Sequence, residues 1–492
     1  MKTKHTASQI REHLQNNQSI LGDLKELLEF LPYCEYELIL FMEAKNVWSG
    51  FFPSPPSGFA KGDGAIELGL FLYWFNHVDQ LDLSVFPPET QKHIKEFIVA
   101  VSIFMPSTQL DLVNYSYFKT NELIYEDGTV LSMEKFANFD QNWFIAFLNL
   151  LESLINNTWY NGGTFPTTTP PSVPLSGKNP NQVTIAIFGD WGAGNQAAKS
   201  VMQSIVNLQP DYLVHVGDVY YAGTPVASHP VSKHYYQLGE EVDNLMNLWP
   251  PHYTGKSFTL NSNHEMYSGA NGLFLDALGA QQTPPGSLSY FSAQKGASCF
   301  SMKFGDWTIL GLDSAYRSSI LTAFMTGGIG GPSEFQTKWI HGLGLNPNKT
   351  IVMSHHNGFA DDCTSVSPLW AEVKNALGGD PYAWYWGHVH NGIVYNRPIS
   401  IPTTKSAPGI TTNTFARCLG HASLPYGHAS SLDGKPIEYQ ANSPRPAPSK
   451  ELYQGFALLT LTMNNGVVDN ISEGFYDISG APSQPRYFRR IL

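Results

Sequence analysis

The sequence predicts an α/β domain built from two packed sheets with helices on the outside, preceded by an all-α domain. Beyond residue 183, short apolar segments each end in a cluster containing Asp, Asn or His, which is typical of strands in α/β proteins. Before residue 160, apolar residues recur at intervals of three and four, which is typical of helices. Between these two parts, residues 161–182 are rich in Pro, Thr and Gly and indicate a linker.

The N-terminal part contains four segments with helical spacing, and Pro or Asp stands where several of them would begin. These segments are residues 8–31, 63–81, 87–105 and 132–155. Two of them are apolar on most faces, so we expect a helical bundle with its own core. The expected organisation is therefore an all-α domain at 1–160, a linker at 161–182 and an α/β domain at 183–492.

The α/β part contains five apolar segments that end in polar clusters, namely residues 183–190, 212–218, 257–265, 350–356 and 382–390. Residues 196–208 are a plausible crossover helix between the first two strands. Residues 299–314 predict a hairpin that turns at Gly305–Asp306, and residues 456–477 predict another that turns at Asn465–Gly466. Parallel and antiparallel strands together indicate two sheets.

Composition excludes several classes of function. The 492 residues carry a net charge of −12, whereas nucleic-acid binding needs a basic surface. The N-terminus lacks the apolar core of a signal peptide, and no apolar run approaches the roughly 18 residues that span a bilayer. The 4 cysteines are widely separated, which indicates free thiols in a reducing compartment. We expect a cytoplasmic protein without nucleic-acid or membrane partners; secretion without a signal stays open, and the oligomeric state is not determined.

The polar residues at the strand ends are candidate metal ligands. Ligands bind at the carboxyl ends of strands in open α/β sheets, so these side chains are expected to converge on one cavity. They offer oxygen and imidazole donors without thiolate, which suits iron, manganese or zinc. They are Asp190, Asp218, Asn263, His264, Glu265, His355, His356, His388 and His390.

These residues, in this order, resemble the motifs of the calcineurin-like metallophosphoesterases over residues 183–480. The family order D-x-[GH], G-D, G-N-H-[DE], His and G-H-x-H is matched by Asp190-Trp191-Gly192, Gly217-Asp218, Asn263-His264-Glu265, His355 and Gly387-His388-Val389-His390. The resemblance implies a four-layer sandwich of two mixed sheets flanked by helices. It also implies hydrolysis of phosphate esters by a dinuclear metal centre, with a metal-bound hydroxide attacking in line.

The resemblance further assigns a role to each residue. Asp218 would bridge the metals, and His264 would lie beside the substrate and donate a proton to the leaving group. His388 and His390 would point to the same side of an extended segment. The ligands of the two ions would be Asp190 with His390, and Asn263 with His355 and His388, each set sharing Asp218.

Two departures from the general pattern point to one subclass, the purple acid phosphatases. This subclass has Gly in the first motif, here Gly192, and supplies a tyrosine ligand in G-D-x-x-Y, here Tyr221. Phenolate is a hard anionic donor, so the resemblance implies iron(III) beside a divalent iron, zinc or manganese ion. Tyr220 is expected to be a packing neighbour of Tyr221.

Other positions keep alternatives open. Ser262 replaces the family Gly before Asn263, which questions the backbone geometry there. His356 is an alternative ligand to His355. His421 and His428 either line the substrate site or belong to a Gly-rich surface loop. The two remaining acids are expected to support structure, Glu265 by bonding backbone or a His, and Asp313 at a strand end.

The predicted function is that of an acid phosphatase-like hydrolase acting on a small phosphorylated substrate or a phosphoprotein. The same ligands would serve a phosphodiesterase, for example one acting on cyclic nucleotides. A protein of another class, a binding or scaffold protein acting through its helical domain, is the further alternative.

Overall fold

The computed structural model describes residues 122–124, 130–132, 159–222, 240–318, 324–403, 408–424, 432, 434–441, 453–478 and 484–492. The chain divides into two compact units: residues 1–158 with 321–323, and residues 159–320 with 324–492. In the first unit, the described residues form an antiparallel pair, β1 (Glu122–Ile124) with β2 (Val130–Ser132). The predicted all-α domain did not include this pair, and its helices otherwise lie outside the described residues.

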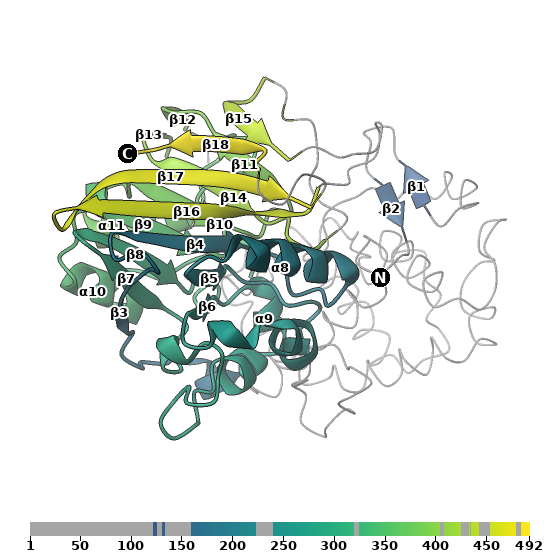
Figure 1. Cartoon of the computed structure of the whole chain (residues 1–492). Helices are drawn as coiled ribbons and strands as arrows, with labels where there is room; N and C mark the ends of the chain where they lie inside the picture. Colours follow the sequence, from purple (N-terminus) through teal and green to yellow (C-terminus); the bar gives the residue numbers. More distant parts are fainter. Residues whose placement is uncertain are drawn as a thin grey trace, which may run out of the picture. The chain divides into compact units, whose positions relative to one another are not determined.

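The first main sheet has six strands in the order β18-β17-β16-β4-β5-β6 (Figure 1). Strands β4, β5 and β6 are parallel, and the others are antiparallel. Their bounds are β4 Gln182–Phe188, β5 Tyr212–His215, β6 Ser257–Thr259, β16 Gly455–Asn464, β17 Val467–Asp477 and β18 Tyr487–Arg490. Helix α8 (Gln196–Leu208) connects β4 to β5, as predicted, and begins where the Asn195 side chain accepts a hydrogen bond from the Ala198 amide.

The second main sheet has eight strands in the order β15-β11-β14-β10-β9-β8-β7-β3, with β8, β9, β10 and β14 parallel. Their bounds are β3 Ser172–Pro174, β7 Phe300–Phe304, β8 Trp307–Leu312, β9 Thr350–Ser354, β10 Ala383–Trp386, β11 Gly392–Tyr395, β14 Phe415–Leu419 and β15 Ile437–Gln440. A separate pair consists of β12 (Ile399–Ile401) and β13 (Ile410–Thr412). Both predicted hairpins, β7–β8 and β16–β17, are confirmed.

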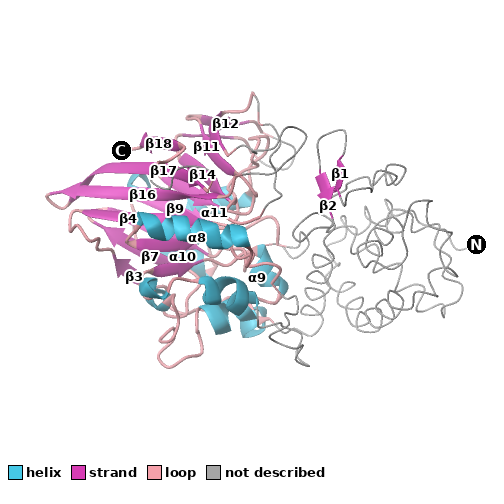
Figure 2. Cartoon of the chain, turned by 45° about the vertical axis from the view of Figure 1, so that its right-hand side comes forward, coloured by secondary structure: helices cyan, strands magenta, loops and turns pink. Residues whose placement is uncertain are grey.

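Helices cover the outer faces of the two sheets. Helix α8 lies next to β4 in both views (Figures 1 and 2), and α10 (Phe335–Gly342) and α11 (Pro368–Leu377) pack on the eight-stranded sheet. The short α9 (Asn263–Tyr267) follows β6. The remaining short helices are η3 Tyr160–Gly163, η4 Glu241–Leu245, η5 Met246–Leu248, η6 Pro251–Tyr253, η7 Gly272–Ala277, η8 Ser292–Gln294 and η10 Pro347–Lys349.

Alternating side chains create two cores. In β9, Ile351 and Met353 face the other sheet, whereas Val352 faces α11, because successive side chains of a strand point to opposite faces. Between the sheets, the Arg417 guanidinium on β14 donates from Nε to Glu473 Oε1 on β17 at 2.8 Å. This buried ion pair joins the sheets. The prediction of two mixed sheets flanked by helices is therefore confirmed.

Part of the Pro/Thr-rich interval belongs to the sandwich. Strand β3 lies within the predicted linker 161–182 and pairs in parallel with β7 at the edge of the eight-stranded sheet. Phe165 and Leu175 in the same interval are buried. The interval before β4 is therefore part of the second unit and packs with it.

Candidate metal centre

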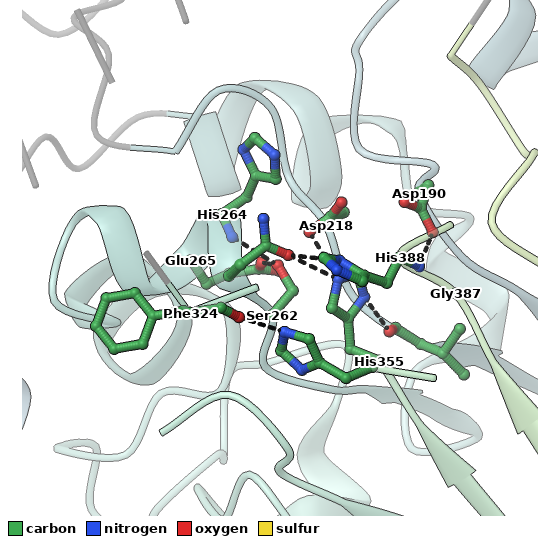
Figure 3. A network of polar contacts seen from close by, with 12 residues as sticks. Asp190, Asp218, Ser262, His264, Glu265, Phe324, His355, Gly387 and His388 are labelled. Carbon is green, nitrogen blue, oxygen red and sulfur yellow. Dashed lines mark hydrogen bonds and ion pairs between the residues drawn. The ribbon is translucent and has the colours of Figure 1, made fainter. Parts of the chain in front are cut away.

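The strand-end residues gather at one edge of the sandwich, where strands from both sheets finish. Asp190 and Asp218 follow β4 and β5 of the six-stranded sheet. His355 and His388 follow β9 and β10 of the eight-stranded sheet. Figure 3 shows these four side chains together, with His264 on the neighbouring α9. The convergence expected from the parallel topology is thus present in the fold.

One group of donors, which we call cluster A, consists of Asp190, Tyr220 and His390. The Tyr220 hydroxyl lies 3.0 Å from Asp190 Oδ1 and 3.1 Å from His390 Nε2. His390 Nε2 is also 3.3 Å from Asp190 Oδ1. Cluster A therefore offers a carboxylate, a phenol and an imidazole around one point.

A second group, cluster B, consists of Asn263, His355 and His388. The Asn263 Oδ1 atom lies 2.9 Å from His355 Nε2 and 3.1 Å from His388 Nδ1. Cluster B therefore offers an amide oxygen and two imidazole nitrogens, without a carboxylate or a phenol of its own.

Asp218 lies between the clusters and contributes one oxygen to each. Its Oδ2 atom accepts a hydrogen bond from the Tyr220 hydroxyl at 2.7 Å, on the side of cluster A. Its Oδ1 atom lies 3.2 Å from His355 Nε2, on the side of cluster B. The two oxygens of Asp218 thus face different clusters, as a carboxylate bridging two cations would require.

The donors fit metal ions by spacing and by chemistry. Atoms that bind one cation at about 2.1 Å and at right angles to one another lie about 3 Å apart, as these do. The His355 Nδ1 atom donates to the Val216 carbonyl at 3.0 Å, so the ring directs Nε2 toward two oxygens, Asn263 Oδ1 and Asp218 Oδ1. A cation between these atoms stabilises that arrangement. Among the described residues, two overlapping groups of Asp and His have ligand atoms close enough together to hold one metal ion: Asp190–Asp218–His355 and His355–His356–His388.

Burial and charge set the protonation of both clusters. Burial raises the pKa of the Tyr220 phenol well above its usual value, and the carboxylates of Asp190 and Asp218 raise it further. Burial also raises the pKa of Asp190, as does the negative charge of Asp218. For Asp218 itself, burial opposes ionisation, but His355, His264, His388 and the hydrogen bond from Ser262 together hold the pKa well below its usual range. Burial lowers the pKa of His388 to about 3, so this ring of cluster B is neutral near pH 7.

The loop that carries the last two histidines is not the extended segment that the sequence predicts. The Val389 amide bonds the Gly387 carbonyl at 2.7 Å, and the Asn391 amide bonds the Val389 carbonyl at 2.5 Å, so the chain makes consecutive tight turns. The His388 amide donates to Asp190 Oδ2 at 2.9 Å, which ties this loop to cluster A. The turns, rather than strand alternation, direct both rings to the centre.

The structure favours Tyr220 over Tyr221 as the tyrosine of the centre, whereas the sequence motif indicates Tyr221. The Tyr220 hydroxyl contacts three predicted ligands, Asp190, Asp218 and His390. Its carbonyl accepts a hydrogen bond from Asn244 Nδ2 at 2.5 Å, and the Tyr221 amide donates to Glu240 Oε1 at 2.7 Å. Asn244 within η4 and Glu240 just before it therefore hold this loop, and motif spacing does not contain that information.

His355 and His356 have different partners. Both ring nitrogens of His356 are engaged: Nδ1 lies 2.9 Å from Ser314 Oγ, and Nε2 lies 2.6 Å from the Phe324 carbonyl. His355 instead directs Nε2 at Asn263 and Asp218. These contacts favour His355 as the ligand and give His356 a structural role.

Helix α9 holds Asn263 and His264 in place. The Ser262 side chain caps the helix by accepting from the His264 amide at 3.0 Å, and the Glu265 carboxylate bonds the Ser262 hydroxyl. Glu265 therefore supports the loop through a serine rather than through backbone or a His. Ser262 has φ −137° and ψ 177°, an extended conformation that needs no glycine.

Two further candidates among the described residues, His421 and Asp313, play no direct part in the clusters. His421 is buried, and its ring packs where a Cβ on Gly392 or Gly455 would lie. His428 lies outside the described residues. Asp313 accepts hydrogen bonds from the Ala315 and Tyr316 amides, which agrees with a structural role.

The family model of the calcineurin-like phosphoesterases matches residues 183–392, an interval that contains every donor of both clusters. These residues therefore form a calcineurin-like phosphoesterase domain, which implies metal-dependent cleavage of phosphoesters. No curated protein sequence gives a significant match.

Two solved structures are similar to parts of the chain. One is that of GAP50, the anchor in the inner membrane complex of Plasmodium; it is 14% identical, the match covers 63% of this chain and 88% of that one, and the TM-score is 0.38. The other is a hypothetical protein from Thermus thermophilus at 12% identity, with a match that covers 60% and 99% of the two chains and a TM-score of 0.28. Among the described residues, no helix has the length and apolar character needed to cross a membrane.

Proposed function

We propose that this chain hydrolyses phosphate monoesters with a dinuclear centre of the purple acid phosphatase type. The observation that carries the proposal is the carboxylate of Asp218, which offers one oxygen to each of two donor clusters. One cluster contains a tyrosine hydroxyl, and phenolate is a hard anionic donor that favours iron(III). Cluster A would hold iron(III), and cluster B would hold divalent iron, zinc or manganese.

The protein residues have distinct tasks in this proposal. When bound, the two cations would activate a water nucleophile and stabilise the charge that develops on the phosphoryl group. Asp218 would keep the cations close together by offsetting their repulsion. His264 lies against Tyr220, with ring centroids 4.5 Å apart, and would donate a proton to the leaving oxygen.

The proposed substrate is a small phosphorylated molecule or a phosphoprotein. The net charge of −12 does not favour nucleic acid as a partner. It is compatible with an anionic phosphoester, because bound cations supply the positive charge at the site.

Metal analysis combined with hydrolysis assays tests the proposal. The purified, oxidised protein is expected to contain two metals per chain, at least one of them iron, and to show visible phenolate-to-iron absorption. It should cleave p-nitrophenyl phosphate faster than bis-p-nitrophenyl phosphate. The reverse preference would identify a phosphodiesterase, and two colourless divalent ions would exclude the purple acid phosphatase type. Full metal content without hydrolysis of either ester would support a binding or scaffold role.

A further inference from the structure

Tyr267, at the end of α9, has a hydrogen-bond donor directed at a weak acceptor. The Asn263 side chain turns its oxygen toward His355 and His388 of cluster B. Its Nδ2 atom donates to the Tyr267 hydroxyl oxygen at 3.2 Å. The Tyr267 hydroxyl must therefore send its hydrogen elsewhere. Its acceptor among the described residues is the Met325 sulfur at 3.9 Å, and a thioether is a weak acceptor. A stronger acceptor, such as a phosphoryl oxygen, would replace it readily.

Met325 is an exposed apolar side chain beside a candidate metal ligand. It is 49% exposed, whereas the preceding Phe324 is 1% exposed. The Phe324 carbonyl accepts a hydrogen bond from His356 Nε2, which holds the backbone of this segment next to His356. The Met325 sulfur lies 3.6 Å from Asn263 Nδ2, so its side chain stands next to cluster B.

A row of side chains leads from the centre to these two residues. The His264 ring contacts both Tyr220, at 4.5 Å between centroids, and Tyr267, at 4.9 Å. His264 is the residue to which we assign proton donation to the leaving group. Tyr267 contacts this proposed proton donor and Met325 contacts Tyr267, so in the proposed function both would lie near the departing alcohol.

We propose that Tyr267 donates a hydrogen bond to a phosphoryl oxygen of the substrate and that Met325 forms an apolar wall for its alcohol. The preferred substrates are then phosphate monoesters of apolar, above all aromatic, alcohols. This inference rests on the proposed function and names its substrate class. It also makes Tyr267 a substrate contact, and not only a support for Asn263.

Tyr267→Phe tests the hydrogen bond, because it removes only the hydroxyl. A hydrogen bond to a charged oxygen contributes enough to expect about a tenfold rise in KM for p-nitrophenyl phosphate and in Ki for inorganic phosphate. Both metals should be retained, and kcat should change less than KM. Loss of the cluster B metal would show that Tyr267 only supports Asn263. An unchanged Ki would also overturn the contact.

Met325→Ala tests the apolar wall, with Met325→Leu as the matched control. For each variant, kcat/KM is measured with phenyl phosphate and with glycerol phosphate, and each value is divided by that of the unaltered protein, which cancels the intrinsic reactivity of the esters. Met325→Ala should lower the phenyl value about fivefold more than the glycerol value, and Met325→Leu should restore most of it. Equal changes for the two esters would overturn the wall.

Failure of the inference and failure of the proposed function give different results. If the unaltered protein holds two metals but cleaves no ester, the proposed function fails. Calorimetric titration of that metal-loaded protein with inorganic phosphate would still test Tyr267. Weaker binding by Tyr267→Phe would support the contact, and equal binding would refute it.

Discussion

Clusters A and B lie side by side and share Asp218, yet their donors differ in charge. Cluster A combines the Asp190 carboxylate with the Tyr220 phenol and one imidazole. Cluster B combines an amide oxygen with two imidazoles and has no anionic donor of its own among the described residues. A more highly charged cation gains more from anionic donors, which is why we propose a trivalent ion in A and a divalent ion in B.

The two clusters also differ in which donors carry a proton when no metal is bound. In A, the buried phenol retains its proton beside two carboxyl groups, and its pKa is raised. In B, burial keeps the His388 ring neutral by lowering its pKa to about 3. The His388 ring therefore need not lose a proton to bind a cation near neutral pH, whereas the Tyr220 phenol must.

The largest effect is expected from Asp218→Asn, which removes the shared charge. The amide keeps the shape of the side chain but no longer offsets the repulsion between two cations. We expect loss of at least one metal and a fall in hydrolysis of about a thousandfold or more, with the fold intact. Metal analysis and circular dichroism measure these outcomes. Full occupancy of both clusters in this variant would refute the bridging role.

Replacing His355 and His356 in turn should distinguish a residue that binds metal in cluster B from a neighbour that only stabilises the fold. His355→Gln removes a donor to cluster B, so the divalent metal should be lost and activity should fall by about a hundredfold or more. His356→Gln breaks the bonds to Ser314 and Phe324, so it should lower the free energy of unfolding by about 1–3 kcal/mol while both metals stay bound. Metal content and thermal unfolding measure the two effects, and the opposite pattern would make His356 the ligand.

The tyrosines test cluster A in the same way. Tyr220→Phe should abolish the visible absorption of the oxidised protein and weaken iron(III) retention about tenfold or more, because the phenolate donor is lost. Tyr221→Phe should leave the colour unchanged. Visible spectra and iron analysis of both variants decide the matter. Bleaching by Tyr221→Phe alone would restore the assignment that the sequence motif favours.

The smallest expected effect is the number of protons released when each cluster fills. At pH 6, iron(III) binding to A should release at least one proton, because the Tyr220 phenol, with its raised pKa, must ionise. A divalent ion entering B should release almost none from His388, which is already neutral above about pH 3. Affinity at A should therefore increase with pH more steeply than at B. Calorimetry in buffers of different ionisation enthalpy measures this, and equal release at both clusters would contradict it.

Much of the centre was predictable from the sequence because most of its donor residues directly follow predicted strands. Asp190, Asp218, Asn263, His388 and His390 each stand just beyond an apolar segment, and parallel topology brings such positions to one edge. The pairing of β3 with β7 was not predictable in this way. The three residues of β3 lie in a Pro/Thr-rich interval, and they form a strand because the edge of β7 offers hydrogen bonds.

The sequence by itself determined the order and chemical type of the donors and the class of the domain, since these depend on residues near one another in the chain. Only the tertiary structure decided between neighbouring residues of the same type. The Tyr220 hydroxyl reaches cluster A where Asn244 and Glu240 hold the loop, and Ser314 and the Phe324 carbonyl engage both ring nitrogens of His356. Those contacts come from segments remote in sequence, and the direction of a side chain in a loop depends on them.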